Sequence, residues 1–133
     1  MFMDYGKLVE HWVETSDKDF IAMETMFNGK QYSWSLFIGH LVLEKLLKAL
    51  FVKVNLIEAP KIHNLIVLAE KSNLDLDKNM VQKLSIINTF NIDSRYEDEK
   101  KIFFKLCTKE FTQEQVENIK EIRQWLKQKL TGK

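Results

Sequence analysis

Hydrophobic residues recur along the first part of the chain with the three- and four-residue spacing of amphipathic helices. Residues 4–14 carry apolar side chains on one face, at Tyr5, Leu8, Val9, Trp12 and Val13. Ser16 follows, with Asp19 three residues later, which predicts an N-cap and the start of a second helix. Asn28-Gly29 is a typical helix end, so the pattern predicts two helices before residue 30.

The segment from Tyr32 to Asn55 is apolar nearly all the way round and predicts the longest helix. A surface helix keeps one polar face, so this one is expected at the centre of the fold, covered on several sides. Its richest apolar part still contains charged and polar side chains, at His40, Glu44, Lys45, Lys48 and Lys53. Such residues are too costly at the depth of a bilayer, which favours a core helix over a membrane span.

The rest of the chain predicts further helices separated by short breaks. After Pro60, helices are expected at about 62–73, at 77–90 behind an Asp77 cap, and from a Thr112 cap onward. Residues 91–111 are interpreted as a loop followed by a short helix. Four glycines and one proline leave little material for turns, and no repeat or linker is evident. We therefore predict one all-α domain over residues 1–133, a bundle of five or six helices around a long central helix.

Composition narrows the function classes without naming one. The net charge of +1 gives no global positive field, so any nucleic-acid site must be local. Cys107 is the only cysteine, which rules out an intramolecular disulfide and favours a packed thiol over a nucleophile. The chain lacks a phosphate-binding glycine loop and a zinc-protease motif, and its three histidines are dispersed. We expect no metal or cofactor, and the lack of an N-terminal apolar run predicts a cytoplasmic protein.

His40, Glu44 and Lys48 form one polar stripe on the predicted central helix, because they are spaced four residues apart. A buried charge is costly unless it is paired, so the stripe must meet solvent, a cleft or polar partners. One interpretation is an ion pair between Glu44 and Lys48 within the helix, with His40 above it. The other is the wall of a cleft, in which Lys48 offers a cation beside aromatic side chains.

Two further segments carry candidate chemistry. His63 and Asn64 stand at the expected start of a helix, where unsatisfied backbone N–H groups can bind an anion or be capped by these side chains. Arg95 and Tyr96 lie in a polar stretch, and the chain has only one other arginine, Arg123. A guanidinium and an aromatic ring can hold a phosphate and stack on a base. Alternatively, Arg95 forms a salt bridge with Glu44 or another nearby acid.

The order of these segments resembles a known family. The segments are the run Trp34–Leu50 with Phe37, His40, Glu44 and Lys48, then His63-Asn64-Leu65 after Pro60, then Phe90-Asn91 followed by Ser94-Arg95-Tyr96. Together they resemble HEPN domains, the helical family named for nucleotide binding in higher eukaryotes and prokaryotes. The resemblance implies a helical bundle, usually a homodimer, often encoded with a small nucleotidyltransferase as a toxin–antitoxin-like pair.

Some HEPN proteins are metal-independent ribonucleases, and this sequence departs from their pattern. They carry an arginine and a polar residue four to six positions before a histidine. Here residues 55–61 precede His63 and contain no arginine, and Lys61 is too close to replace it. Similar family members often have Tyr-Pro-Asp after the later arginine, whereas this chain has Tyr96-Glu97-Asp98.

The leading hypothesis is a noncatalytic HEPN domain that binds a nucleotide, RNA or a nucleotidyltransferase partner through His63, Asn64, Arg95 and Tyr96. The first alternative is a ribonuclease toxin in which His63 transfers protons and Arg95 supplies the cation from another loop. The second is a purely structural interaction module. A homodimer is expected, because this many large apolar residues should leave one helix face uncovered. No membrane partner is expected.

Overall fold

The computed structural model describes residues 4–93 and 95–132, and within them the chain forms six α-helices and no strand. The helices are α1 (Tyr5–Asn28), α2 (Tyr32–Asn55), α3 (Leu65–Lys71), α4 (Lys78–Asn88), α5 (Glu97–Leu106) and α6 (Lys109–Leu130). The predicted all-α class is confirmed. Ser94, which belongs to one of the sequence motifs, lies outside the described residues.

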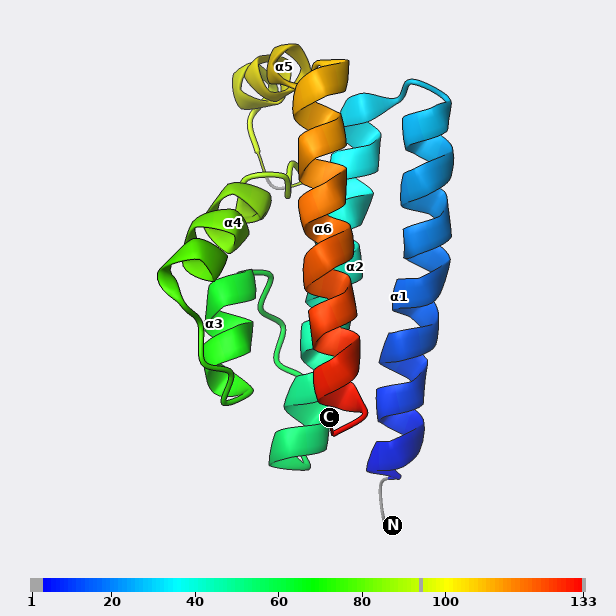
Figure 1. Cartoon of the computed structure of the whole chain (residues 1–133), viewed down its shortest axis with the longest axis vertical. Coiled ribbons are helices and arrows are strands. Elements are labelled where there is room, and N and C mark those ends of the chain that lie inside the picture. The colour runs from blue at the N-terminus through cyan, green and yellow to red at the C-terminus, as the bar shows by residue number, and fades with distance from the viewer. Residues whose placement is uncertain (1–3, 94, 133) are drawn as a thin grey trace.

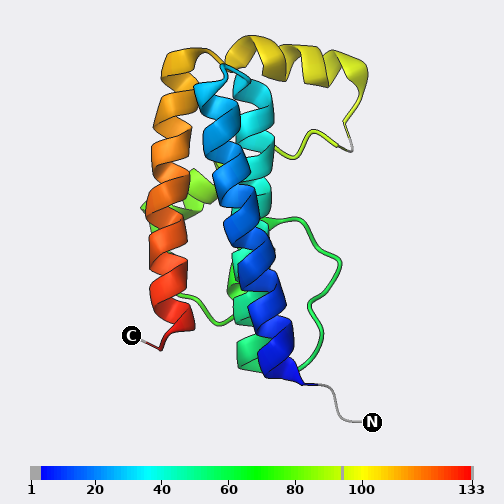
Figure 2. The same ribbon diagram turned by 90° about the vertical axis from the view of Figure 1, so that its right-hand side faces the viewer.

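The long helices α1, α2 and α6 run side by side, and α2 contacts each of the other five helices (Figure 1). The short helices α3 and α4 cover one side of this group. Helix α5 crosses the end of the bundle where α2 begins, as both views show (Figure 2). The prediction of a long central helix is therefore confirmed.

The interior of the bundle is built on α2, whose side chains are buried on several faces. Leu36, Val42, Leu43, Leu46 and Val52 are all fully buried. Gly39 marks a close approach of the neighbouring helices, because a Cβ atom there would lie 2.5 Å from Ile119 of α6 and 3.0 Å from Met23 of α1. The absence of a side chain at this position lets α1 and α6 both pack against α2.

The predicted break at Ser16 is wrong, because α1 continues from Tyr5 to Asn28. Ser16 is fully buried, and its hydroxyl donates a 2.8 Å hydrogen bond to the backbone carbonyl of Val42 in α2. In the opposite direction, from α2 to α1, the Ser35 hydroxyl donates a 2.9 Å hydrogen bond to the Met23 carbonyl. These small polar residues join α1 to α2 rather than starting a helix, which is why a capping pattern alone was misleading.

The observed caps and ends of α4 and α6 differ in part from the predicted boundaries. Asp77 caps α4 as predicted, accepting from the Met80 amide at 2.7 Å, but this helix ends at Asn88 rather than at residue 90. Thr108, and not Thr112, caps α6 by accepting from the Phe111 amide at 3.2 Å. Thr112 lies one turn inside the helix and is fully buried.

Among the described helices, none contains a stretch long and apolar enough to cross a membrane. Cys107 is buried at the end of α5, and burial raises the pKa of its thiol to about 12. A thiol with this pKa is protonated at neutral pH, so its interpretation as a packed residue is confirmed.

Candidate functional site

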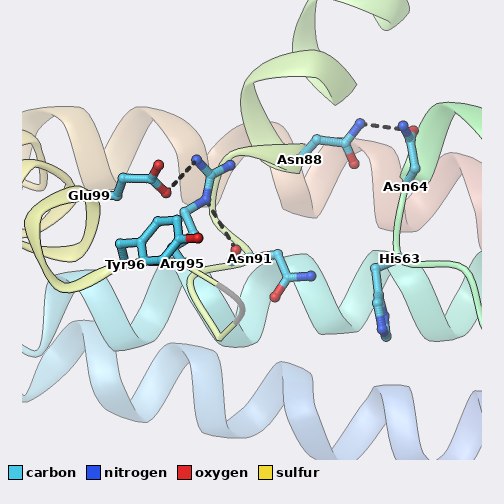
Figure 3. Close-up of a pocket in the computed structure, with 7 residues that line it drawn as sticks. All are labelled: His63, Asn64, Asn88, Asn91, Arg95, Tyr96 and Glu99. Atoms are coloured by element: carbon cyan, nitrogen blue, oxygen red, sulfur yellow. Dashed lines mark hydrogen bonds and ion pairs between the residues drawn. The ribbon is translucent and has the colours of Figure 1, made fainter.

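A polar cavity of about 430 Å³ opens where the segment before α3 meets the segment between α4 and α5. Its lining residues are His63, Asn64, Asn88, Asn91, Arg95, Tyr96 and Glu99. Figure 3 shows Arg95, Tyr96 and Glu99 at one end, and His63, Asn64 and Asn88 at the other. The four residues singled out from the sequence, His63, Asn64, Arg95 and Tyr96, therefore line one cavity although thirty positions of the chain lie between the two pairs.

The Asn64 side chain mainly caps the start of α3. Its side-chain oxygen accepts hydrogen bonds from the amides of Ile66 at 3.0 Å and Val67 at 3.3 Å. The Leu65 amide donates to Asn88 at 2.8 Å, and the Asn88 amide group donates to Asn64 at 3.1 Å. The first N–H groups of α3 thus have side-chain acceptors, which supports the capping interpretation and not an anion site made by this helix. The Nδ2 group of Asn64 is the donor that it can offer to a ligand.

His63 is oriented from the core by Glu44 of α2. Its Nδ1 atom lies 2.9 Å from Oε1 of Glu44, and because a carboxylate only accepts hydrogen bonds, Nδ1 must carry the proton. In the neutral ring the Nε2 atom is then an acceptor. The His63 side chain remains 63% exposed, whereas Glu44 is buried. A buried carboxylate therefore fixes the ring orientation of an exposed histidine.

The stripe of His40, Glu44 and Lys48 is buried and does not line the cavity. Lys48 donates to Glu44 at 3.1 Å, which is the ion pair of the simpler interpretation. His40 donates from Nε2 to the backbone carbonyl of His63 at 3.0 Å. Lys48 also lies 5.4 Å from the centre of the Trp12 ring in α1. The stripe supports the cavity from behind through His63, and its cleft-wall interpretation is not supported.

Arg95 lies beside a nearby acid, as one of the two interpretations predicted, and this acid is Glu99 rather than Glu44. Its Nη1 atom is 3.7 Å from Glu99, one turn into α5, and its Nε atom donates to the Asn91 carbonyl at 3.4 Å. The Tyr96 side chain is 82% exposed and makes no side-chain cap to α5. Both contacts of Arg95 are long, so its guanidinium can exchange Glu99 for another acceptor at little cost.

Asn88, Asn91 and Glu99 complete the cavity. Asn91 was noted only as part of the family-like run, and Asn88 and Glu99 were not singled out from the sequence. Glu99 was detectable in principle, because it stands four residues after Arg95 at the start of a helix. Asn88 gave no such signal, since its role depends on the distant segment around Asn64. Asparagine amides both donate and accept, so they add hydrogen-bonding capacity to the cavity without adding charge.

Burial of His40 makes the stability of the fold dependent on pH. Burial lowers the pKa of His40 below its ordinary 6.5, by more than the nearby Glu44 carboxylate raises it. The unfolded chain therefore takes up a proton at a higher pH than the folded chain, and the free energy of unfolding falls as the pH drops below about 6.5.

We predict that His40→Gln, which keeps an N–H donor for the His63 carbonyl, loses less stability than the wild type between about pH 7.5 and about pH 5. Urea unfolding at several pH values measures this difference. The exposed His11 provides the matched control, and His11→Gln should retain the wild-type pH dependence. If the free energy of unfolding changed with pH equally in wild type and His40→Gln, His40 would not contribute to the pH dependence of stability.

The comparisons with known proteins give one positive result. The sequence model described as HEPN domain matches residues 9–129 of the chain. No curated protein and no solved structure matches the chain. The match extends from α1 to α6 and includes every residue of the cavity. The chain therefore belongs to the HEPN domain family.

Proposed function

We propose that the protein is a noncatalytic HEPN domain that binds a nucleotide in the cavity between His63 and Arg95. The observation that carries the proposal is the convergence of a guanidinium, an exposed tyrosine, a histidine and an asparagine on one polar cavity of about 430 Å³. Nucleotides need a cation or N–H donors for phosphate, a flat surface for the base and hydrogen-bonding groups for the sugar. The cavity offers each of these.

Each residue has a defined task in this proposal. Arg95 binds the phosphate by exchanging its long contact with Glu99 for two short, charge-assisted hydrogen bonds that it donates to phosphate oxygens. The exposed ring of Tyr96 stacks on the base. At the other end, Nε2 of His63 accepts a hydrogen bond from a hydroxyl group, and Nδ2 of Asn64 donates one.

The argument against catalysis is electrostatic. Metal-free cleavage of RNA needs a proton-transfer group and a cation that stabilises the charge on the phosphorane. His63 can transfer a proton, but no arginine stands in residues 55–61 before it. Arg95 lies at the other end of the cavity from His63, so the cation and the proton-transfer group do not converge on one phosphate.

A ribonuclease is the second candidate, and one observation favours it. The Glu44 carboxylate holds Nδ1 of His63 and leaves Nε2 as an oriented acceptor, which is the arrangement of a general base. Arg95 would then have to supply the cation from its own loop or from a second subunit. A purely structural interaction module is the third reading, and it predicts no nucleotide binding.

Family membership and surface chemistry also motivate a proposal about partners. We propose a homodimer, which functions with a small nucleotidyltransferase in a toxin–antitoxin-like pair. Several large apolar side chains are at least half exposed, among them Leu56, Ile57, Ile102 and Leu106. Exposed apolar side chains of this size are typical of association surfaces.

The nucleotide site predicts a specific role for one of the two arginines. Arg95→Ala should weaken the binding of guanosine 5′-monophosphate by about tenfold or more, because it removes a charge-assisted contact to phosphate. Arg95→Lys should recover only part of this affinity, since an ammonium group lacks the fork geometry. Isothermal titration calorimetry measures the dissociation constants.

Arg123 supplies the matched control, because it lies on α6 and pairs with Asp17 of α1 at 3.0 Å. Arg123→Lys should leave nucleotide binding unchanged. Equal affinities of wild type and Arg95→Ala would refute the role of Arg95. If the wild type bound no nucleotide, the structural interaction module would be the remaining hypothesis.

The dimer is tested by the mass in solution. Multi-angle light scattering should give about twice the chain mass of 15.8 kDa at micromolar concentrations. A mass equal to that of one chain at every concentration would contradict the dimer without affecting the nucleotide site.

The noncatalytic reading predicts that the purified protein does not cleave RNA in a manner that depends on His63. The assay incubates mixed-sequence RNA without added metal, with wild type, His63→Ala and Arg95→Ala in parallel. Removal of one electrostatic contact to the transition state typically costs on the order of 10²–10³ in rate, so a real activity would be visibly lost in both variants. Cleavage by the wild type alone would establish the ribonuclease candidate instead.

A further inference from the structure

A second cavity, of about 230 Å³, lies on the other side of the segment that carries Arg95. It is lined by Trp34, Phe37, Ile92, Asp93, Glu97, Lys100 and Phe104. Its aromatic walls come from the first turns of α2 and from α5, where α5 crosses the end of the bundle (Figure 2). No residue of this cavity lines the first one, and the proposed mononucleotide site does not use it.

The two cavities share one wall, because their lining residues alternate along the chain. Asn91, Arg95, Tyr96 and Glu99 face the first cavity, and Ile92, Asp93, Glu97 and Lys100 face the second. Asp93 and Arg95 are two residues apart, so their Cα atoms are separated by at most about 7 Å. A ligand whose phosphate is held by Arg95 can therefore extend across this wall into the second cavity.

The aromatic side chains of the second cavity are accessible. Trp34 is 48% exposed and Phe104 is 46% exposed. The rings of Trp34 and Phe37 meet edge to face, with centroids 6.1 Å apart at an angle of 80°. Half-exposed rings at the mouth of a cavity provide a flat surface on which a nucleobase can stack.

The charges select the part of a nucleotide that enters this cavity. Asp93 and Glu97 repel a phosphate, whereas a neutral base is not repelled and can donate N–H groups to both carboxylates. Lys100, which lies 3.8 Å from Glu97, can donate to a carbonyl oxygen of the same base. Guanine presents two neighbouring N–H donor groups and one carbonyl, so it fits this set best.

From these observations we infer that the second cavity is a base subsite, and that the protein binds two linked nucleotides of single-stranded RNA. The inference rests on the proposed nucleotide site. The phosphate lies at Arg95, one base stacks on Tyr96, and the adjoining base enters between Trp34 and Phe104. The preferred ligand is therefore an oligonucleotide containing guanine, and a mononucleotide fills only half of the site.

The test compares GMP with the ribodinucleotide GpG, because each of these ligands carries one phosphate group. Wild type should bind GpG on the order of tenfold more tightly than GMP, because a second base is stacked. Trp34→Ala and Phe104→Ala should remove this advantage and leave the affinity for GMP unchanged, whereas Trp34→Phe should retain most of it. Ile21→Ala is the control, since Ile21 of α1 is 65% exposed and lines neither cavity.

Circular dichroism and thermal unfolding establish that each variant is folded before binding is measured. If GMP binds but GpG binds no better, or if Trp34→Ala and Phe104→Ala keep the full GpG advantage, the base subsite is wrong and the nucleotide site stands. If neither ligand binds the wild type, the nucleotide site itself fails. If Trp34→Ala changes the mass in light scattering but not the GpG affinity, the cavity belongs to a protein interface and the inference is overturned.

Discussion

The position of the candidate site depends on one buried carboxylate. Glu44 stands on a helix that is packed on several sides, so its charge has to be compensated inside the protein. One of its oxygens contacts Lys48 on the same helix, and the other contacts His63 outside it. Removal of either partner would leave a charge in the core with fewer hydrogen bonds. The segment before α3 is thereby held against α2 at His63.

His40 strengthens the same connection one turn earlier in α2. It donates to the backbone carbonyl of His63, so the side chain and the backbone of this residue are both bonded to the central helix. Asn64 follows directly and begins α3, and Asn88 joins that start to the end of α4. Polar contacts therefore extend from the core through the segment before α3 to the end of α4. The end of the site that holds His63, Asn64 and Asn88 is therefore positioned by the bundle and not by the loops alone.

The sequence predicted those features that depend on local pattern. The bounds of α2 follow from its apolar character, and the cap at Asp77 follows from the residue types of a helix start. His40, Glu44 and Lys48 could be placed on one face by their spacing, but their partner His63 could not, because it comes from another segment. Ser16 and Thr112 were misassigned for a related reason. Both residues favour caps in isolation, and both are instead buried against neighbouring helices.

The second cavity was invisible to sequence reasoning, because Trp34 and Phe104 are far apart in the chain and are ordinary core-type residues. What the sequence does contain is the charge pattern from Asp93 to Lys100, in which Arg95 is surrounded by acids. Such a segment is a poor match for a nonspecific polyanion site, which needs several cations without competing carboxylates. A ligand that offers one phosphate to Arg95 and neutral, hydrogen-bonding bases to the acids is compatible with it. The acidic residues that weaken general affinity for nucleic acid are therefore the same residues that can select a particular base.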